Sequence, residues 1–447
     1  MPYSAPLETK TQSGWRDTFG LYRNVLAIVS ALTILQGAAA ALSVMIALSL
    51  QAAGASNAAL GLVAACYAGG FLTGAILSPR QISRIGHIRS FSFFAAIAIL
   101  ASLSFTLGVN IFGWSLLQVV VGLSTSALLT AGDSWITDSA PPENRGMLLG
   151  FYHVVSRLGV IAGPFAILAG ASGLTGFVMV AAFFALTILP ITATRKSQPE
   201  MVAGTPFGPA KILKYAPAAA FAAFCAGAVN NAVAQLYPVF ASAVAPGSAA
   251  SFTANFNAAM LVGAMAGLWP AGYISDRIDR RTVIAGPGII GALAALGLAV
   301  LSQTAAPVVI LALGFAFGVG AMSYYAVAVA HAADRARPDQ ATSMMAGILV
   351  IWGIGSVIGP IAAGLLMSTP LGAPGLFAFS GGSLALLAAT MFTRTVNKPA
   401  VSDEEKEPFT AAQATSLALS ELDPRGGQEN EQFDLFLAWM ASSETDT

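Results

Sequence analysis

The sequence predicts an all-α membrane protein with twelve transmembrane helices in two pseudo-symmetric six-helix bundles. Composition, the spacing of apolar runs and the placement of basic residues all point to this fold. Of the 447 residues, 56% are hydrophobic and 9% are charged, whereas a soluble domain averages about 25% charged residues. This composition excludes a typical cytosolic enzyme and a disordered chain. Because 21 Lys and Arg balance 21 Asp and Glu, it also excludes a nucleic-acid-binding protein.

Twelve apolar runs account for most of the chain. A transmembrane helix needs about 20 mostly apolar residues, and each run is close to that length or longer. The predicted spans cover residues 26–50, 57–79, 91–109, 113–136, 146–169, 175–193, 215–241, 252–274, 283–302, 307–332, 342–367 and 374–393. Runs of this length favour helices over the short alternating strands of a membrane barrel.

Basic residues separate the two sides of the membrane. Twenty of the 21 Lys and Arg lie in the termini or in the connections on one side. The connections on the other side contain none; they are residues 51–56, 110–112, 170–174, 242–251, 303–306 and 368–373. The positive-inside rule then places both termini in the cytoplasm. We expect a multi-pass protein of the plasma membrane, which would be the inner membrane of a bacterium.

The two halves of the chain repeat one another at an offset of 196 residues. Gly159, Gly163 and Pro164 correspond to Gly355, Gly359 and Pro360, and we expect both sets to allow close helix packing and bending. Parallel repeats of this kind are one architecture of secondary transporters. The predicted segments are a cytoplasmic N-terminal tail, a first bundle, a cytoplasmic linker, a second bundle and an acidic cytoplasmic tail, at residues 1–24, 25–193, 194–214, 215–393 and 394–447.

A loop motif resembles the signature of a known family. Residues 272–281 read G-Y-I-S-D-R-I-D-R-R, which resembles the G-x-x-x-D-R-x-x-R-R loop of the major facilitator superfamily. The fifth and eleventh runs both contain its G-x-x-x-G-P pattern. The segment 133–146 is similar to a bacterial branch whose members mostly lack known substrates. The resemblance covers about residues 25–393 and implies transport by alternating access. The equivalent loop after the second run departs from it, with Pro79 and Ser83 in place of the leading glycine and the aspartate.

Arg157 is the one charged residue well inside a predicted span. A lipid-facing arginine there would cost several kcal/mol, about 2.5–3.5 on insertion scales, so we expect it to face a cavity or a partner. The resemblance implies that spans 1, 4, 7 and 10 line a central cavity, and polar residues gather in those spans. The candidate cavity residues are Gln36, Thr125, Arg157, Asn230, Asn231, Gln235, Tyr324 and Tyr325. The alternative is that Arg157 is structural and that the polar residues only bond helices together. Trp352 is interpreted as an interface or packing residue.

Asp133 and His153 form a candidate proton-coupling pair. A buried carboxylate with a raised pKa beside a histidine could take up and release a proton. The alternative is a carboxylate that holds the turn between the fourth and fifth spans.

Asp276 and Arg277 follow the eighth span, and the superfamily resemblance implies that this loop lies beside the start of the fifth span. A helix start offers free N–H groups to a carboxylate. We therefore predict a conformational latch of Asp276, Arg277 and Arg145. The alternative is that Asp276 caps only its own loop.

The favoured function is secondary transport of a small solute, with an organic anion or a zwitterion preferred. A symporter or antiporter could couple this transport to protons, and a uniporter is the alternative. Export of lipophilic drugs is the alternative within transport. The rival from another class is a membrane receptor or assembly factor whose acidic tail contacts a cytoplasmic partner. The expected partners are the bilayer and a small-molecule substrate. No catalytic triad, metal site or cofactor motif supports an enzyme.

Overall fold

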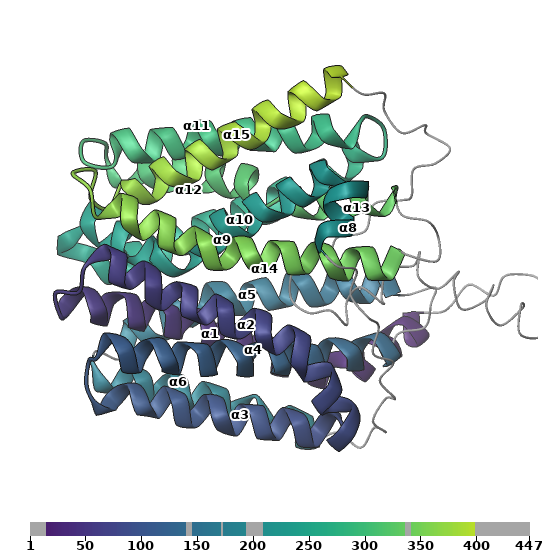
Figure 1. Ribbon diagram of the computed structural model, residues 1–447. Coiled ribbons are helices and arrows are strands. Elements are labelled where there is room, and N and C mark those ends of the chain that lie inside the picture. The colour runs from purple at the N-terminus through teal and green to yellow at the C-terminus, as the bar shows by residue number, and fades with distance from the viewer. Residues whose placement is uncertain (1–14, 140–144, 171–172, 194–208, 336–340, 398–447) are drawn as a thin grey trace, which may run out of the picture.

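The computed structural model describes residues 15–139, 145–170, 173–193, 209–335 and 341–397. They form long helices that run roughly side by side (Figure 1). The main helices are α1 (Trp15–Ala52), α2 (Asn57–Ile85), α3 (His87–Ser104), α4 (Ile111–Ser139), α5 (Arg145–Gly170), α6 (Leu174–Leu186), α7 (Ile188–Ala193), α8 (Pro209–Tyr215), α9 (Pro217–Val244), α10 (Ala249–Ser275), α11 (Arg280–Leu301), α12 (Pro307–Ala321), α13 (Tyr324–Ala333), α14 (Ala341–Met367) and α15 (Gly375–Asn397).

Within the described residues, 11 segments are long and apolar enough to cross a membrane. The remaining predicted run, 146–169, is covered by α5, a helix of 26 residues. The chain is therefore an all-helical membrane protein, as the sequence predicts.

The helices fall into two groups that contact each other along a few seams. In Figure 1 the purple to blue helices α1–α6 lie together, and the teal to yellow helices α9–α15 lie beside them. Within the groups, α1 packs on α5 and α2 on α4, while α9 packs on α14 and α11 on α15. Between the groups, α2 meets α14, α5 meets α10 and α1 meets α9.

Glycines bring helix backbones into direct contact within each group. A Cβ on Gly159 or Gly163 of α5 would overlap a backbone carbonyl of α1, and a Cβ on Gly355 or Gly359 of α14 would overlap one of α9. The four carbonyls belong to Thr33, Gly37, Phe224 and Ala228, in the same order. The repeated glycines thus build the same kind of seam in both halves, because only a residue without a side chain permits this approach.

The tenth predicted run, 307–332, is not one continuous helix. It breaks into α12 and α13 at Met322, with φ −109° and ψ 0°, and Ser323, with φ −99°. The Ser323 hydroxyl donates to the Val319 carbonyl at 2.6 Å. Glycines just before the break lower the helix propensity there, a feature that hydropathy alone does not register.

The second predicted run continues further than its apolar stretch. α2 passes through Pro79 to Ile85, so the segment expected to be a loop is helical. Gly86, with φ +85°, is the one residue between α2 and α3. This φ lies in the region that only glycine adopts readily. Part of the predicted linker 194–214 is also helical, since residues 209–215 form α8, which packs on α14.

The two ends of the bundle differ in charge. We call the end with the connections after α2 and α10 the charged end, and the end with residues 51–56 and 368–373 the uncharged end. At the uncharged end the halves are joined. The Asn57 side-chain Nδ2 donates to the Met367 carbonyl at 2.8 Å, and the Ala58 N–H donates to the Ser368 hydroxyl at 3.0 Å.

Two further contacts tighten this closure. The Ser242 hydroxyl donates to Gln51 Oε1 at 3.0 Å, joining the ends of α9 and α1. Gly61 of α2 lies so close to the Pro360 carbonyl of α14 that a Cβ would overlap it. The halves are therefore in close contact at the uncharged end.

Candidate functional site

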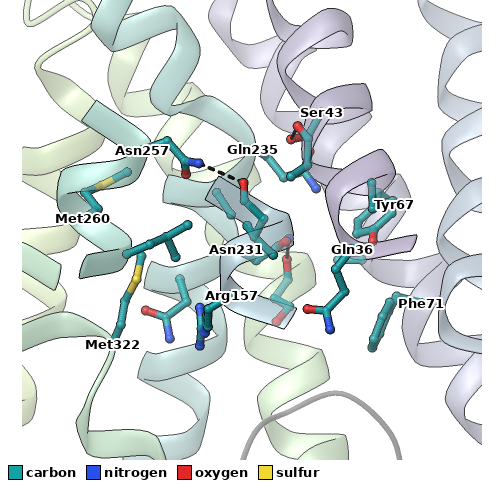
Figure 2. A pocket seen from close by; sticks show the side chains of 18 of the residues that line it. Gln36, Ser43, Tyr67, Phe71, Arg157, Asn231, Gln235, Asn257, Met260 and Met322 are labelled. Carbon is teal, nitrogen blue, oxygen red and sulfur yellow. Dashed lines mark hydrogen bonds between the residues drawn. The ribbon is translucent and has the colours of Figure 1, made fainter. Parts of the chain in front are cut away.

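A cavity of about 320 Å³ lies between the two halves. Its lining residues come from α1, α2, α4, α5, α9, α10, α13, α14 and the break before α13. Figure 2 shows the side chains of 18 of them. The volume of the cavity falls in the lower part of the range of small-molecule sites.

The cavity gathers most of the residues that the sequence pointed to. Seven of the eight candidates line it: Gln36, Thr125, Arg157, Asn230, Asn231, Gln235 and Tyr325. Tyr324 does not; its side chain is fully buried. Successive residues of a helix point about 100° apart, and here Tyr325 faces the cavity while Tyr324 packs into the surrounding protein.

Arg157 gives the cavity its charge. It stands on α5 and points toward the middle of the lining (Figure 2). The lining holds no carboxylate within the described part of the chain. A cation surrounded by amides and apolar groups attracts an anion more strongly than it would in water, because the surrounding dielectric is low.

Two asparagines are oriented by bonds to backbone carbonyls. Asn257 Nδ2 donates to the Val160 carbonyl at 3.2 Å, and Asn231 Nδ2 donates to the Ser356 carbonyl at 2.8 Å. A carbonyl can only accept, so the amide nitrogen must face it and each Oδ1 must face elsewhere. The Asn257 bond also joins α10 to α5 across the two halves.

Several lining residues were not expected from the sequence. They are Ser43, Tyr67, Phe71, Asn257, Ser356 and Trp352, the last of which was interpreted as packing. A single polar or aromatic side chain in an apolar run does not reveal which way its helix faces. The spacing of Tyr67 and Phe71, four residues apart on one helix face, was the available signal.

Asp133 lies next to the cavity wall but not in it. Its side chain is fully buried and hydrogen-bonds with the Tyr152 hydroxyl. Tyr152 in turn accepts a bond from Gln36 Nε2 at 3.5 Å, and Gln36 lines the cavity. The ring of His153 is 5.2 Å from that of Tyr152. Tyr152, which the sequence did not single out, therefore links the cavity to Asp133.

The predicted latch residues lie at the charged end. Arg277 Nη1 donates to the Tyr273 carbonyl at 2.9 Å, and its guanidinium lies 3.5 Å from the centre of the Tyr273 ring. Asp276 follows the last residue of α10, and α10 packs on α5, which begins at Arg145. The Arg145 side chain lies outside the described residues, so the latch stays a prediction.

A buried ionic cluster stands near this loop. Arg280 Nε lies 2.8 Å from an Asp334 carboxylate oxygen, with both side chains almost fully buried. Arg281 pairs with Asp279 and donates to the Arg394 carbonyl at 2.8 Å. Burial alone would raise the pKa of Asp279, but the hydrogen bonds and charge of Arg281 outweigh it and lower that pKa below its usual value. This cluster ties α11 to α13 and α15.

Comparison with known proteins decides the family. The model of the Major Facilitator Superfamily matches residues 26–309 and 219–439. The chain belongs to the major facilitator superfamily. It is therefore a membrane transporter of that superfamily and not an enzyme.

Two curated relatives are similar to this superfamily member over most of its length. An uncharacterized MFS-type transporter of Enterobacter sp. (strain 638) is 27% identical over 357 residues, covering 77% of this chain and 89% of the relative. The uncharacterized MFS-type transporter YcaD of Escherichia coli O17:K52:H18 is 27% identical over 350 residues, with the same coverage.

Solved structures share the fold of this superfamily member. A mutant form of the nucleoside transporter NupG superposes with a TM-score of 0.70 at 12% identity, covering 84% of this chain and all of that one. A D-xylose-proton symporter gives 0.68 at 14% identity, covering 86% and 99%. At these identities the likeness establishes architecture alone.

Proposed function

We propose that this superfamily member is a secondary transporter that moves a small organic anion or zwitterion by alternating access. The observation that carries the proposal is Arg157, a cation on the wall of a cavity between the halves whose described lining contains no acid. The oriented Asn231 and Asn257 oxygens add acceptors for the donor groups of a zwitterion.

Alternating access needs two halves that rock about a central site. The glycine seams hold α1 on α5 and α9 on α14 within each half, and alternating access requires the contacts between the halves at the uncharged end to separate. With that end closed, the substrate would enter this state from the charged end. The distribution of basic residues supports a cytoplasmic position for the charged end and for both termini.

The orientation is open to a direct test in a background without Cys66 and Cys225. A cysteine introduced at the exposed Ser248 of the uncharged end should react with an impermeant maleimide from outside. A cysteine at Ser83 of the charged end, also exposed, should react only after permeabilisation. The reverse pattern would invert the topology.

Arg157 is tested by substitution and ligand binding. In a panel of organic anions, amino acids, sugars and lipophilic cations, we expect wild-type protein to bind anions or zwitterions. Arg157→Ala should weaken binding about ten- to a hundredfold, because a hydrogen bond to a charged group contributes about 1.5–3 kcal/mol. Arg157→Lys should retain part of the affinity, since lysine keeps the charge but loses the planar fork.

The control is Arg89→Gln, which removes a charge from an exposed position on α3. It should bind as the wild type does. Normal uptake by folded Arg157→Ala protein in proteoliposomes would reduce Arg157 to a packing role. Selective binding of lipophilic cations would favour drug export instead.

We further propose that Asp133 carries the coupling proton. The bonds from Gln36 through Tyr152 to Asp133 supply a route by which an occupied cavity could sense the protonation state of the carboxyl group. Asp133→Asn should abolish proton-driven accumulation of substrate while leaving counterflow exchange, because asparagine cannot take up and release a proton. Tyr152→Phe should weaken the coupling in the same direction. Unchanged accumulation by both variants would assign Asp133 to helix-end structure.

A further inference from the structure

Four aromatic rings form a continuous row along one wall of the cavity. The ring centres of Tyr67 and Phe71 are 6.2 Å apart, those of Phe71 and Trp352 are 6.4 Å apart, and those of Trp352 and Tyr325 are also 6.4 Å apart. All four residues line the cavity. The row runs from α2 in the first half to α14 and α13 in the second, so it belongs to the site itself and not to the core of either half.

The rings are tilted or edge-on to each other, at 39°, 66° and 60°. In an edge-on pair the edge of one ring packs on one face of its neighbour, so the pair does not cover the neighbour's other face. Phe71 and Trp352 are only half-buried and line the open cavity. An apolar ring face that borders a cavity is a surface against which a flat, apolar group can pack.

Arg157 and the rings occupy different parts of the same cavity. In Figure 2, Tyr67 and Phe71 stand at one side, Met260 and Met322 at the other, and Arg157 lies between them. A ligand with a charged group at one end and a flat group at the other could reach Arg157 and the rings together. The volume of about 320 Å³ leaves room for a ring system with short substituents.

The charge of the lining decides which ionic group such a ligand carries. Aromatic faces can also hold cations, but Arg157 would repel a cation, and the described lining has no carboxylate to balance one. A carboxylate suits the site because a guanidinium offers it two parallel hydrogen bonds.

We propose that the substrate is a planar aromatic carboxylate, bound with its acid group on Arg157 and its ring against Phe71 and Trp352. This assignment rests on the proposed anion transport and narrows it to one class of molecule. It predicts discrimination between flat and puckered rings of equal charge, which Arg157 alone cannot supply.

The test uses three probes on the purified full-length protein: phenylacetate, cyclohexylacetate and phenylacetamide. Binding is measured by isothermal titration, with quenching of intrinsic tryptophan fluorescence as a second readout. Phenylacetate should bind more tightly than cyclohexylacetate by roughly two- to tenfold, the range that an aromatic pair adds beyond area burial. Phenylacetamide, which keeps the ring but lacks the charge, should bind about tenfold or more weakly than phenylacetate.

Phe71→Leu and Trp352→Leu should bring the ratio between phenylacetate and cyclohexylacetate close to one, because leucine keeps an apolar side chain but removes the flat face. Phe93→Leu is the matched control. It makes the same change on α3, outside the cavity lining, and should leave the ratio intact.

The outcomes distinguish a failure of the aromatic-carboxylate assignment from a failure of the proposed anion transport. Equal binding of the two carboxylates, or a preference that survives both leucine variants, overturns the aromatic assignment and leaves anion transport standing. Equal binding of phenylacetate and phenylacetamide contradicts the anion proposal and with it the assignment. If none of the three probes binds, the aromatic assignment is wrong. The wider ligand panel used for Arg157 then tests whether the protein binds anions at all.

Discussion

At Gly163, one missing methyl group allows α5 to lie against α1. A Cβ there would overlap the Gly37 carbonyl, and neither backbone can move without moving its helix. On the same helix, a Cβ on Gly150 would meet nothing within 4 Å. The two glycines look alike in the sequence, yet one is required by packing and the other is not.

These two positions make a matched pair for a stability measurement. Gly163→Ala should lower the free energy of unfolding by about 1–3 kcal/mol, the usual cost of overpacking. Gly150→Ala should leave it unchanged or raise it by up to about 1 kcal/mol through helix propensity. Thermal melting in detergent compares the two variants. Equal shifts in melting temperature would contradict a close backbone contact between α1 and α5 at Gly163.

The residues that line the cavity were only partly predictable. Arg157 could be predicted because a charged side chain inside a span must face a cavity or a partner and not lipid. The amides of span 7 could be predicted because polar groups are costly in lipid. Tyr67, Phe71 and Trp352 were missed because aromatic residues occur equally well against lipid, in protein cores and in binding sites. Tyr152 was missed for the same reason. Only packing distinguishes these environments.

At the scale of helices, apolar length predicted the 11 described segments that can cross a membrane, and α5 covers the twelfth predicted run. Apolar length could not predict the break at Met322 and Ser323 or the continuation of α2 through Pro79. Both depend on what the backbone packs against, since a proline or a glycine-rich turn can be accommodated wherever neighbours supply the lost contacts.

The predicted latch between the end of α10 and the start of α5 can be measured as a coupling energy. If Asp276 interacts with Arg145 or the first N–H groups of α5, a double-mutant cycle of Asp276→Asn and Arg145→Ala should give a coupling of about 0–1 kcal/mol. The readout is the ratio of open to closed charged ends in spin-label distances. Strictly additive effects would show that Asp276 caps only its own loop, which would fit the bonding of Arg277 to Tyr273.

For the whole molecule, closure of the uncharged end depends on α2 meeting α14. A Cβ on Gly61 of α2 would overlap the Pro360 carbonyl of α14, and a Cβ on Gly364 of α14 would overlap the Asn57 carbonyl of α2. A side chain at this point must push the two halves apart, because both partners are backbone.

Gly61→Val should therefore hold the uncharged end open. Spin labels at the exposed Ala53 and Leu371 should report a longer separation than in the wild type. Gly69→Val, on the same helix but with open space at its Cβ, should keep the wild-type distances. If the two variants give the same distance distribution, Gly61 is not the point that limits closure.

The single-residue connection at Gly86 couples the movements of α2 and α3. Because one residue cannot absorb a large displacement, α3 must tilt whenever α2 moves toward or away from α14. Phe93 on α3 is half-exposed and contributes nothing to the cavity lining. The fluorescence of a dye attached there should change each time the uncharged end opens. Single-molecule recordings of this signal would give the number of transport cycles without a label in the substrate site.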